Sequence, residues 1–283
     1  MLLTCKWHET RKSSYFLWIG LTVGLISLIR PTEVLILIVF WGYEVTSFAD
    51  IKAKAKEVLF SLNHIIFFLF GFFAFWLPQM IYWKTLTDSF VYFSYGDERF
   101  FWTDPQIINF LLSYRKGWFV YTPIMLFSII GLFFILKKKN GFKIPIIIYM
   151  IVNIYILSCW WCWWFGGSFG SRALVQTYAL LAIPLAAFYE YIFITLRIHK
   201  IILSLGKSLV FFVFAGFLCL NVMQTYQCIY PKDGSLMHFD AMTKDAYWRI
   251  FGKFNLSTED WEKFKSELHP PNYDAAKKGE RNN

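Results

Sequence analysis

Charged side chains are scarce in this chain. Asp, Glu, Lys and Arg make up 17% of its 283 residues, whereas soluble domains carry roughly 25%. Hydrophobic residues reach 57% and the mean hydropathy is +0.44. Several apolar runs approach the length of about 20 residues that crosses a bilayer as a helix. The composition therefore excludes an ordinary soluble domain and predicts an all-α, polytopic transmembrane helical bundle.

Cysteine is also scarce, and its placement limits the chemistry. The chain has five cysteines, of which only Cys159 and Cys162 have motif spacing. No second pair of Cys or His lies near them, and the five histidines are dispersed, so the sequence predicts no metal site. Cys159 and Cys162 are either a redox pair or two small apolar residues on one helix face, and their tryptophan neighbours favour the second interpretation.

The net charge of +9 has a definite location. From Tyr226 to the end, nine Lys and Arg balance nine Asp and Glu, so the whole excess lies before Tyr226. Basic residues in a membrane domain mark cytoplasmic loops. The high pI therefore reports membrane orientation and gives no support to a nucleic-acid partner.

The N-terminal part shows no small-residue cleavage site after its first apolar run, so it is not a secretory signal. That run, Tyr15–Ile29, is expected to end at Arg30, because Pro31 disfavours helix at the residue before it. Gly20 and Gly24 within it offer a close-packing face. A second run extends from Val34 to about Val45, and the two are either a hairpin of short crossings or one kinked helix.

Five further segments are predicted to cross the membrane. They are Leu59–Trp83, Trp118–Leu136, Ile144–Trp161, Ala173–Leu196 and Ile201–Gln224. Residues 84–117 form a long polar and aromatic loop with a short surface helix at Ile107–Tyr114. The segment with Lys52, Lys54 and Lys56 is expected to be a loop.

Counting basic residues orients this arrangement. With about seven crossings and a cytoplasmic N-terminus, twelve basic residues face the cytoplasm and six face outward, as the positive-inside rule requires. A single kinked helix at the start would place the N-terminal segment on the wrong side. The cytoplasmic set is Lys6, Arg11, Lys12, Lys52, Lys54, Lys56, Lys137, Lys138, Lys139, Lys143, Arg197 and Lys200. The outer set is Arg30, Lys84, Arg99, Arg115, Lys116 and Arg172.

The same arrangement divides the chain into a transmembrane domain, residues 1–225, and an extracytoplasmic amphipathic tail, residues 226–283. Within the tail, Met242–Phe254 has helical periodicity. Ser257 and Asp260 form a capping box that starts a second helix, which Pro270 ends. The tail either forms a lid or simply packs on the outer surface, and its Lys- and Asn-rich end is expected to fray.

The segment Cys159–Arg172, called here the Trp/Gly stretch, stands out because it follows a long apolar run. Four of the thirteen tryptophans fall within five of its positions, and three glycines and Arg172 follow. Indole rings favour the membrane boundary, and glycines permit sharp turns. A lone arginine there requires an anion or water. The stretch is either the floor of a pocket at the membrane interface or a tight loop with an aromatic belt.

Three segments, in this order, resemble the GT-C superfamily of polytopic glycosyltransferases, which use polyprenyl-phosphate sugar donors. The likeness is to members of the protein-mannosyltransferase and aminoarabinose-transferase type and covers roughly residues 15–225. The segments are Gly24–Thr32, then Tyr95–Trp102 followed by Gly117–Pro123, and finally Trp164–Arg172.

The resemblance implies hexosyl or pentosyl transfer on the extracytoplasmic face of a bacterial inner (plasma) membrane, to a glycan, lipid or protein acceptor. An acceptor hydroxyl would attack the anomeric carbon, and the lipid phosphate would leave. A divalent metal is compatible with such a site. Arginine suits the phosphate because its fork matches the phosphate oxygens. The implied substrate-binding residues are Arg30, Tyr95, Arg99, Trp164 and Arg172. For Arg30, snorkelling to the interface is the alternative.

One departure from the superfamily matters. Its catalytic carboxylate lies in the first large extracytoplasmic loop, which here is only the turn Arg30–Glu33. We therefore expect the chain to correspond to the C-terminal portion of such an enzyme, without the main base. Asp97 and Glu98 are weak candidates for that base and otherwise structure the loop or contact the acceptor. The alternative is a non-catalytic membrane protein, a transporter or a cell-envelope assembly subunit, although a transporter would place charges nearer the bilayer midplane.

Overall fold

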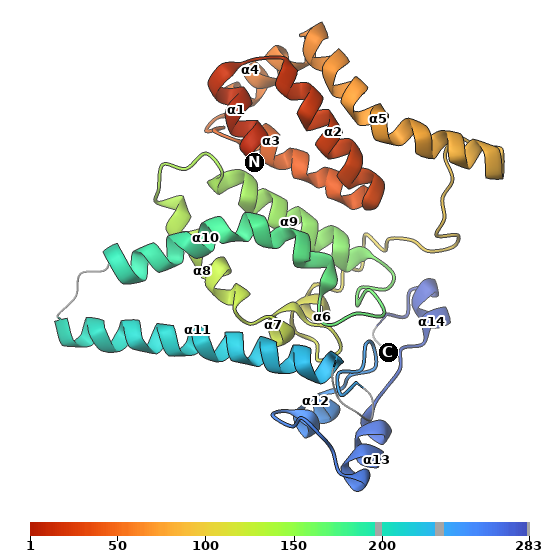
Figure 1. Ribbon diagram of the computed structural model, residues 1–283, viewed down its shortest axis with the longest axis vertical. Coiled ribbons are helices and arrows are strands. Elements are labelled where there is room, and N and C mark those ends of the chain that lie inside the picture. Colours follow the sequence, from red (N-terminus) through yellow and green to blue (C-terminus); the bar gives the residue numbers. More distant parts are fainter. Residues whose placement is uncertain (196–199, 230–234, 282–283) are drawn as a thin grey trace. The chain divides into compact units, whose positions relative to one another are not determined.

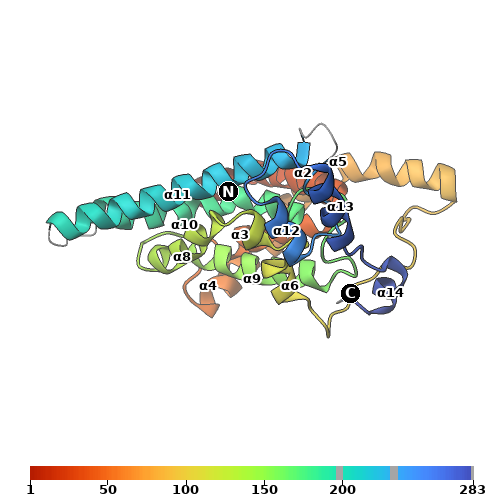
Figure 2. The same cartoon turned by 90° about the horizontal axis from the view of Figure 1, so that it is seen from below.

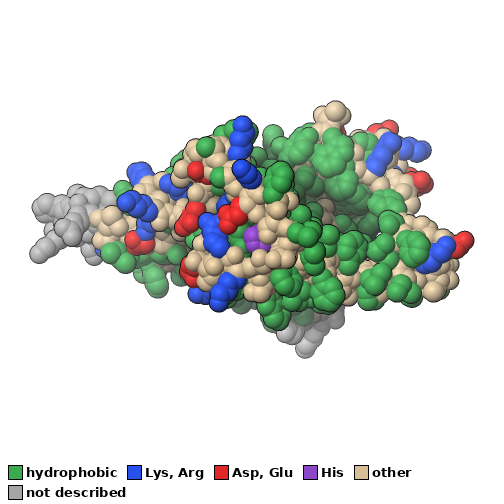
Figure 3. All heavy atoms as spheres, turned by 90° about the horizontal axis from the view of Figure 1, so that it is seen from above, with side chains coloured by type: hydrophobic (Ala, Val, Ile, Leu, Met, Phe, Trp, Pro, Cys, Tyr) green, Lys and Arg blue, Asp and Glu red, His purple; other side chains and the backbone are tan. Residues whose placement is uncertain are grey.

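The computed structural model describes residues 1–195, 200–229 and 235–281 (Figure 1). In this part of the chain the regular structure is helical, and Phe100 and Trp160 form an isolated β-bridge. Three helices are long and apolar enough to cross a membrane: Leu62–Thr87, Arg172–Thr195 and Leu205–Ile229. The predicted all-α class of a membrane protein is therefore confirmed. Hydrophobic side chains also cover much of the face seen in Figure 3.

Four further apolar helices are shorter: Ser14–Ile29, Pro31–Gly42, Met125–Leu136 and Lys143–Cys159. Each has 10–17 residues. Even the longest of these reaches only about 26 Å at 1.5 Å per residue, against a hydrocarbon core of about 30 Å.

The chain divides into two compact units. The first unit contains Met1–Gly96 and Lys139–Asn153, and the second contains Asp97–Lys138 and Ile154–Asn283. Helix α9, Lys143–Cys159, contributes residues to both units. Arg197, one of the predicted cytoplasmic residues, lies outside the described residues.

The first unit is built on helices α1 (Leu2–Thr10), α2 (Ser14–Ile29) and α5 (Leu62–Thr87). Helix α2 ends where the sequence predicts, with Arg30 in an extended conformation. Glycines let α2 and α5 approach closely: a Cβ on Gly20 would collide with the carbonyl of Phe68. The prediction of a close-packing glycine face is confirmed.

The rest of the first unit comprises the 3₁₀ helix η1 (Pro31–Ile36) and helices α3 (Leu37–Gly42) and α4 (Phe48–Leu59). The prediction of a loop around Lys52 is wrong, because this segment forms helix α4. A capping box starts this helix: the Ser47 side chain accepts from the Asp50 N–H, and the Asp50 carboxylate accepts from the Ser47 N–H. The amino group of Lys54 contacts the carbonyl oxygens at the end of α3, at 2.6 Å from that of Tyr43.

The helices of the second unit that precede α12 (Lys244–Ile250) are α6 (Ile107–Leu112), α7 (Trp118–Tyr121), α8 (Met125–Leu136), η2 (Arg172–Thr177), α10 (Tyr178–Glu190), η3 (Tyr191–Thr195) and α11 (Lys200–Ile229). The span predicted over Trp118–Leu136 is interrupted between α7 and α8. Pro123 lies in this break and explains it, because proline lacks a backbone N–H and disfavours helix at the residue before it.

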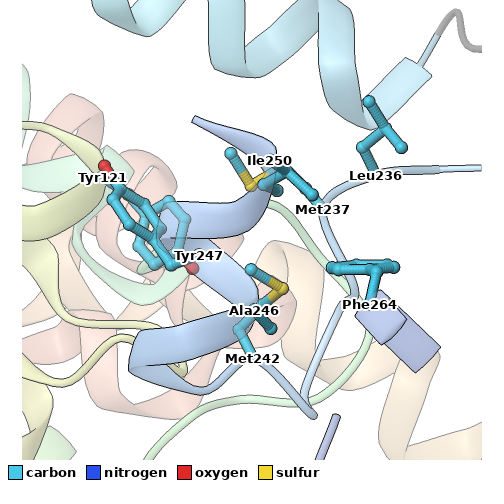
Figure 4. Packing of buried hydrophobic residues seen from close by; sticks show 8 residues of the cluster. All are labelled: Tyr121, Leu236, Met237, Met242, Ala246, Tyr247, Ile250 and Phe264. Atoms are coloured by element: carbon cyan, nitrogen blue, oxygen red, sulfur yellow. The ribbon is translucent and has the colours of Figure 1, made fainter. Parts of the chain in front are cut away.

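The tail adds helices α12 (Lys244–Ile250), α13 (Thr258–Glu267) and α14 (Tyr273–Lys278). Side-chain oxygens of Thr243, Ser257 and Asn272 cap their N-termini, and the Ser257 cap confirms the sequence prediction. Residues of α7, α12, α13 and the segment before α12 form one hydrophobic cluster (Figure 4): Tyr121, Leu236, Met237, Met242, Ala246, Tyr247, Ile250 and Phe264. The expected fraying of the chain end is wrong as far as Arg281, which is buried.

The glycine contact between α2 and α5 gives a prediction. We expect Gly20→Ala to lower the free energy of unfolding by about 1–3 kcal/mol through overpacking. Gly216→Ala is the matched control, because nothing lies within 4 Å of a Cβ built on that helical glycine. The control should be neutral or stabilising by about 0.5–1 kcal/mol, the ordinary helix preference for alanine. Thermal unfolding in detergent compares the two variants, and equal melting temperatures would contradict the packing.

Candidate functional site

The Trp/Gly stretch turns sharply between α9 and η2. Helix α9 ends at Cys159, and the backbone then takes positive φ at Phe165 (55°), Gly166 (56°) and Gly170 (53°). Glycine adopts this left-handed region without steric cost, which explains two of the three positions. Arg172 follows as the first residue of η2.

The tryptophans of the stretch lie inside the second unit. Trp161, Trp163 and Trp164 are at most 6% exposed, and Trp160 is half-buried. The indole N–H of Trp163 donates to the carbonyl of Arg281 at 3.1 Å. An aromatic belt facing lipid does not fit this burial. The rings are part of the core that fixes the loop.

Lys116 is the residue that holds the loop. Its side chain is buried, and its amino group donates to the carbonyl of Gly166 at 2.6 Å, to the Ser168 hydroxyl at 3.0 Å and to the Ser168 carbonyl. Burial lowers the pKa of Lys116 to about 8, and the positive charge of Arg172 acts in the same direction. Sequence reasoning used Lys116 only to orient the chain and missed this role.

The tail supplies a second set of contacts to the same region. The guanidinium of Arg115 lies 5.2 Å from the centre of the Trp164 ring and donates to the His269 carbonyl at 3.3 Å. Burial lowers the pKa of Arg115, whereas the nearby charge of Asp240 opposes that shift. The tail therefore brings a carboxylate close to the basic pair Arg115 and Lys116.

Asp240 itself is buried, and the Tyr273 hydroxyl donates to its carboxylate. Burial first, and then this hydrogen bond, raise the pKa of Tyr273 to about 12. The Tyr273 ring lies 6.0 Å from that of Trp161 and 5.9 Å from that of Trp164. No local signal in the sequence marks Asp240 or Tyr273, since both belong to short segments between helices or at a helix start.

Arg281 closes the other end of the stretch. One guanidinium nitrogen donates to the carbonyls of Ser158, Cys159 and Trp160 at 3.2–3.3 Å, and the other donates to Asp104 at 2.7 Å. These carbonyls belong to the C-terminal end of α9, where a cation is favoured by the helix dipole. Arg281 therefore caps α9 from a position more than a hundred residues along the chain.

Arg172 differs from its basic neighbours because its side chain is exposed. Within the described part of the chain its guanidinium has no hydrogen-bond or ion-pair partner. Its positive charge is close enough to Lys116 to lower the pKa of that lysine. The Asp240 carboxylate partly offsets the charge of Lys116, whereas no described carboxylate pairs with Arg172, and an exposed guanidinium of this kind favours an anion. Whether Arg172 binds an anion stays a prediction.

Three of the predicted substrate-binding residues, Arg99, Trp164 and Arg172, belong to the second unit. The carbonyl of Arg99 accepts from the Trp161 N–H at 3.1 Å, so its segment runs along the Trp/Gly stretch. Asp97 is exposed and Glu98 is half-buried, and whether either acts as a base stays a prediction.

The other two, Arg30 and Tyr95, belong to the first unit. Arg30 lies 3.8 Å from the Glu33 carboxylate, and Glu33 also interacts with the Tyr149 hydroxyl. This contact ties Arg30 to the turn that follows α2. Tyr95 is exposed, with its ring 5.7 Å from that of Phe93.

Cys159 and Cys162 are free, buried thiols. Burial raises the pKa of Cys162 to about 11, which keeps it protonated at neutral pH. The apolar packing interpretation of this pair fits better than a reactive one. Among the described residues, no group of three or more His, Cys, Asp and Glu is placed to hold a metal ion.

Comparison of the chain with models of protein families, with curated proteins and with solved structures finds no match.

The buried amino group of Lys116 predicts a pH dependence. A lysine whose pKa falls from 10.5 to about 8 on folding binds fewer protons folded than unfolded between these values. Stability from this group therefore rises with pH from about 8 to 10.5. We expect the melting temperature of the wild type, relative to Lys116→Met, to rise over this range. A difference that stays constant with pH would contradict the burial of this charge.

Proposed function

We propose that this chain is a membrane protein that binds a polyprenyl-phosphate-linked sugar at the Trp/Gly stretch and serves glycosyl transfer on the extracytoplasmic face of a bacterial plasma membrane. The observation that carries the proposal is the exposed Arg172 guanidinium, which no described carboxylate pairs with, beside the buried ammonium of Lys116. A phosphate group matches both the charge and the fork geometry of arginine.

Two features of the second unit suit a ligand with a phosphate and a sugar. The charge of Lys116 is met by carbonyl and hydroxyl oxygens and is partly offset by the Asp240 carboxylate, whereas no described carboxylate pairs with Arg172. In the same unit, Trp102 has an exposed ring stacked 4.9 Å from Phe100, which offers an apolar face to a sugar ring.

In the proposed reaction, the acceptor hydroxyl attacks the anomeric carbon of the sugar, its proton passes to a carboxylate, and the bond from that carbon to the lipid phosphate breaks as the phosphate leaves. Arg172 stabilises the negative charge that grows on the departing phosphate oxygen. Asp97 and Glu98 precede Arg99 in the segment beside the stretch and are the candidates for contacting the acceptor hydroxyl. The early loop that carries the base in the resembling enzymes is represented here by Arg30–Glu33.

The proposal includes a topology of seven crossings, with the N-terminus in the cytoplasm and the tail outside. The three long apolar helices and the four shorter ones account for seven apolar segments. The twelve-to-six distribution of basic residues supports this orientation. Short helices are accommodated by local thinning of the bilayer or by snorkelling of flanking residues.

The topology is tested with two exposed positions on opposite predicted sides. We expect Ser94→Cys to react with a membrane-impermeant maleimide in intact cells and Lys52→Cys to react only after the membrane is ruptured. The unsubstituted chain supplies the background from native cysteines. The reverse labelling pattern would contradict the orientation.

The phosphate role of Arg172 predicts a loss of donor binding on substitution. Arg172→Ala should weaken binding of a polyprenyl-phosphate sugar by roughly ten- to a hundredfold, since a charge-assisted hydrogen bond contributes about 1.5–3 kcal/mol. Arg172→Lys should be intermediate, because it keeps the charge and loses the fork. The measurement is donor affinity in detergent, with thermal unfolding to verify folding.

Lys265→Ala is the matched control, since Lys265 is also an exposed cation of the second unit and its ammonium lies over the Trp261 ring. It should change donor affinity much less. Unchanged donor affinity in a well-folded Arg172→Ala protein would rule out the phosphate site.

A further inference from the structure

Two glutamines near the end of α11 attach the first tail helix to a candidate membrane span. Gln224 and Gln227 are fully buried, and both lie in the span Leu205–Ile229. The Gln224 amide donates to the Tyr247 hydroxyl at 2.8 Å. The Gln227 amide donates to the carbonyls of Ile250 and Lys253 at 2.7 Å each. Helix α12 is thereby fixed at the end of a span, which is the level of the membrane–water boundary.

The surface of α12 and the following turn carries large exposed rings. Trp248 is 54% exposed, Phe251 42% and Phe254 49%. The Trp248 and Phe251 rings lie 5.0 Å apart, and the Phe254 ring lies 5.3 Å from that of Tyr226 in the last turns of α11. Figures 1 and 2 both show α12 beside the C-terminal end of α11. These four residues, Tyr226, Trp248, Phe251 and Phe254, are called here the aromatic patch.

The basic residues next to the aromatic patch are balanced in number by acidic ones, and two of them form ion pairs. Arg249 donates to Glu267 at 2.7 Å, and Lys253 lies 3.2 Å from Asp260. Lys244, at the start of α12, has the acidic Asp245 as its neighbour. The patch therefore offers apolar rings and little net positive charge, which distinguishes it from a surface that recognises anionic headgroups.

We propose that the aromatic patch lies in the interfacial layer of the bilayer and anchors the tail to the lipid surface. Aromatic rings favour this layer because one part is apolar and another part remains hydrated. The Trp248 indole fits this pattern, since its N–H donates to the Tyr114 hydroxyl at 3.2 Å while its ring is exposed. The attachment depends on partition of the rings, so it does not require anionic lipid. It also does not depend on the sugar chemistry proposed above.

The test uses the full chain reconstituted into phosphatidylcholine vesicles, with a nitroxide spin label at Phe251→Cys or Phe254→Cys. Glu262→Cys in α13 is the control, because it is an exposed tail position outside the patch. We expect the patch labels to collide more often with oxygen, which concentrates in lipid, than with a water-soluble nickel chelate. The control label should show the reverse preference. Patch labels that prefer the nickel chelate, as the control label does, would overturn the proposal. That result is also the one expected if the patch is a binding surface for another protein.

A second measurement separates ring partition from charge attraction. The oxygen preference of the patch labels should persist when part of the phosphatidylcholine is replaced by anionic phosphatidylglycerol and when salt is added. A preference that appears only with anionic lipid would overturn the proposal. Phe251→Ser with Phe254→Ser should leave the melting temperature in detergent nearly unchanged and lower it in vesicles. An equal change in both media would also count against the anchor.

Discussion

The second unit depends on one buried charge, the ammonium of Lys116. A buried lysine is stable only when oxygen acceptors surround it, and the turn at Gly166 and Ser168 provides them. The left-handed backbone at Gly166 belongs to the same turn. The result is a fixed loop, followed directly by the exposed Arg172. The Lys116 ammonium therefore has two effects: its hydrogen bonds order the backbone of the turn, and its charge adds to the positive potential near Arg172.

The tail completes this arrangement from the far end of the chain. Arg281 caps α9 through three carbonyls and pairs with Asp104, while Tyr273 and Asp240 lie near Trp164 and Arg115. The Trp/Gly stretch is therefore held at its start by the tail and in its middle by Lys116. Arg281 contacts residues 158–160 and Lys116 contacts residues 166 and 168, so the two sets of contacts hold neighbouring parts of one loop. Loss of either set is therefore expected to disturb the loop that carries Arg172.

Local signals in the sequence were sufficient for the helical class, the end of α2 at Arg30 and the Ser257 cap, since each depends on neighbouring residues. The capping box at Ser47 was overlooked, and Pro123 interrupts a segment whose hydropathy is continuous. Trp164 and Arg172 were predicted from the Trp/Gly stretch and from the resemblance to glycosyltransferases, and their binding role stays a prediction. Lys116, Asp240 and Arg281 were missed because their partners lie far along the chain, and no periodicity or motif encodes such contacts.

The most direct test of the Lys116 account is amide hydrogen exchange of the full chain in detergent, comparing wild type with Lys116→Met. Loss of the ammonium removes three hydrogen bonds from the turn at Gly166 and Ser168. We expect faster exchange in peptides covering residues 160–172 and unchanged exchange in helix α8, Met125–Leu136. Equal protection of residues 160–172 in both proteins would contradict it.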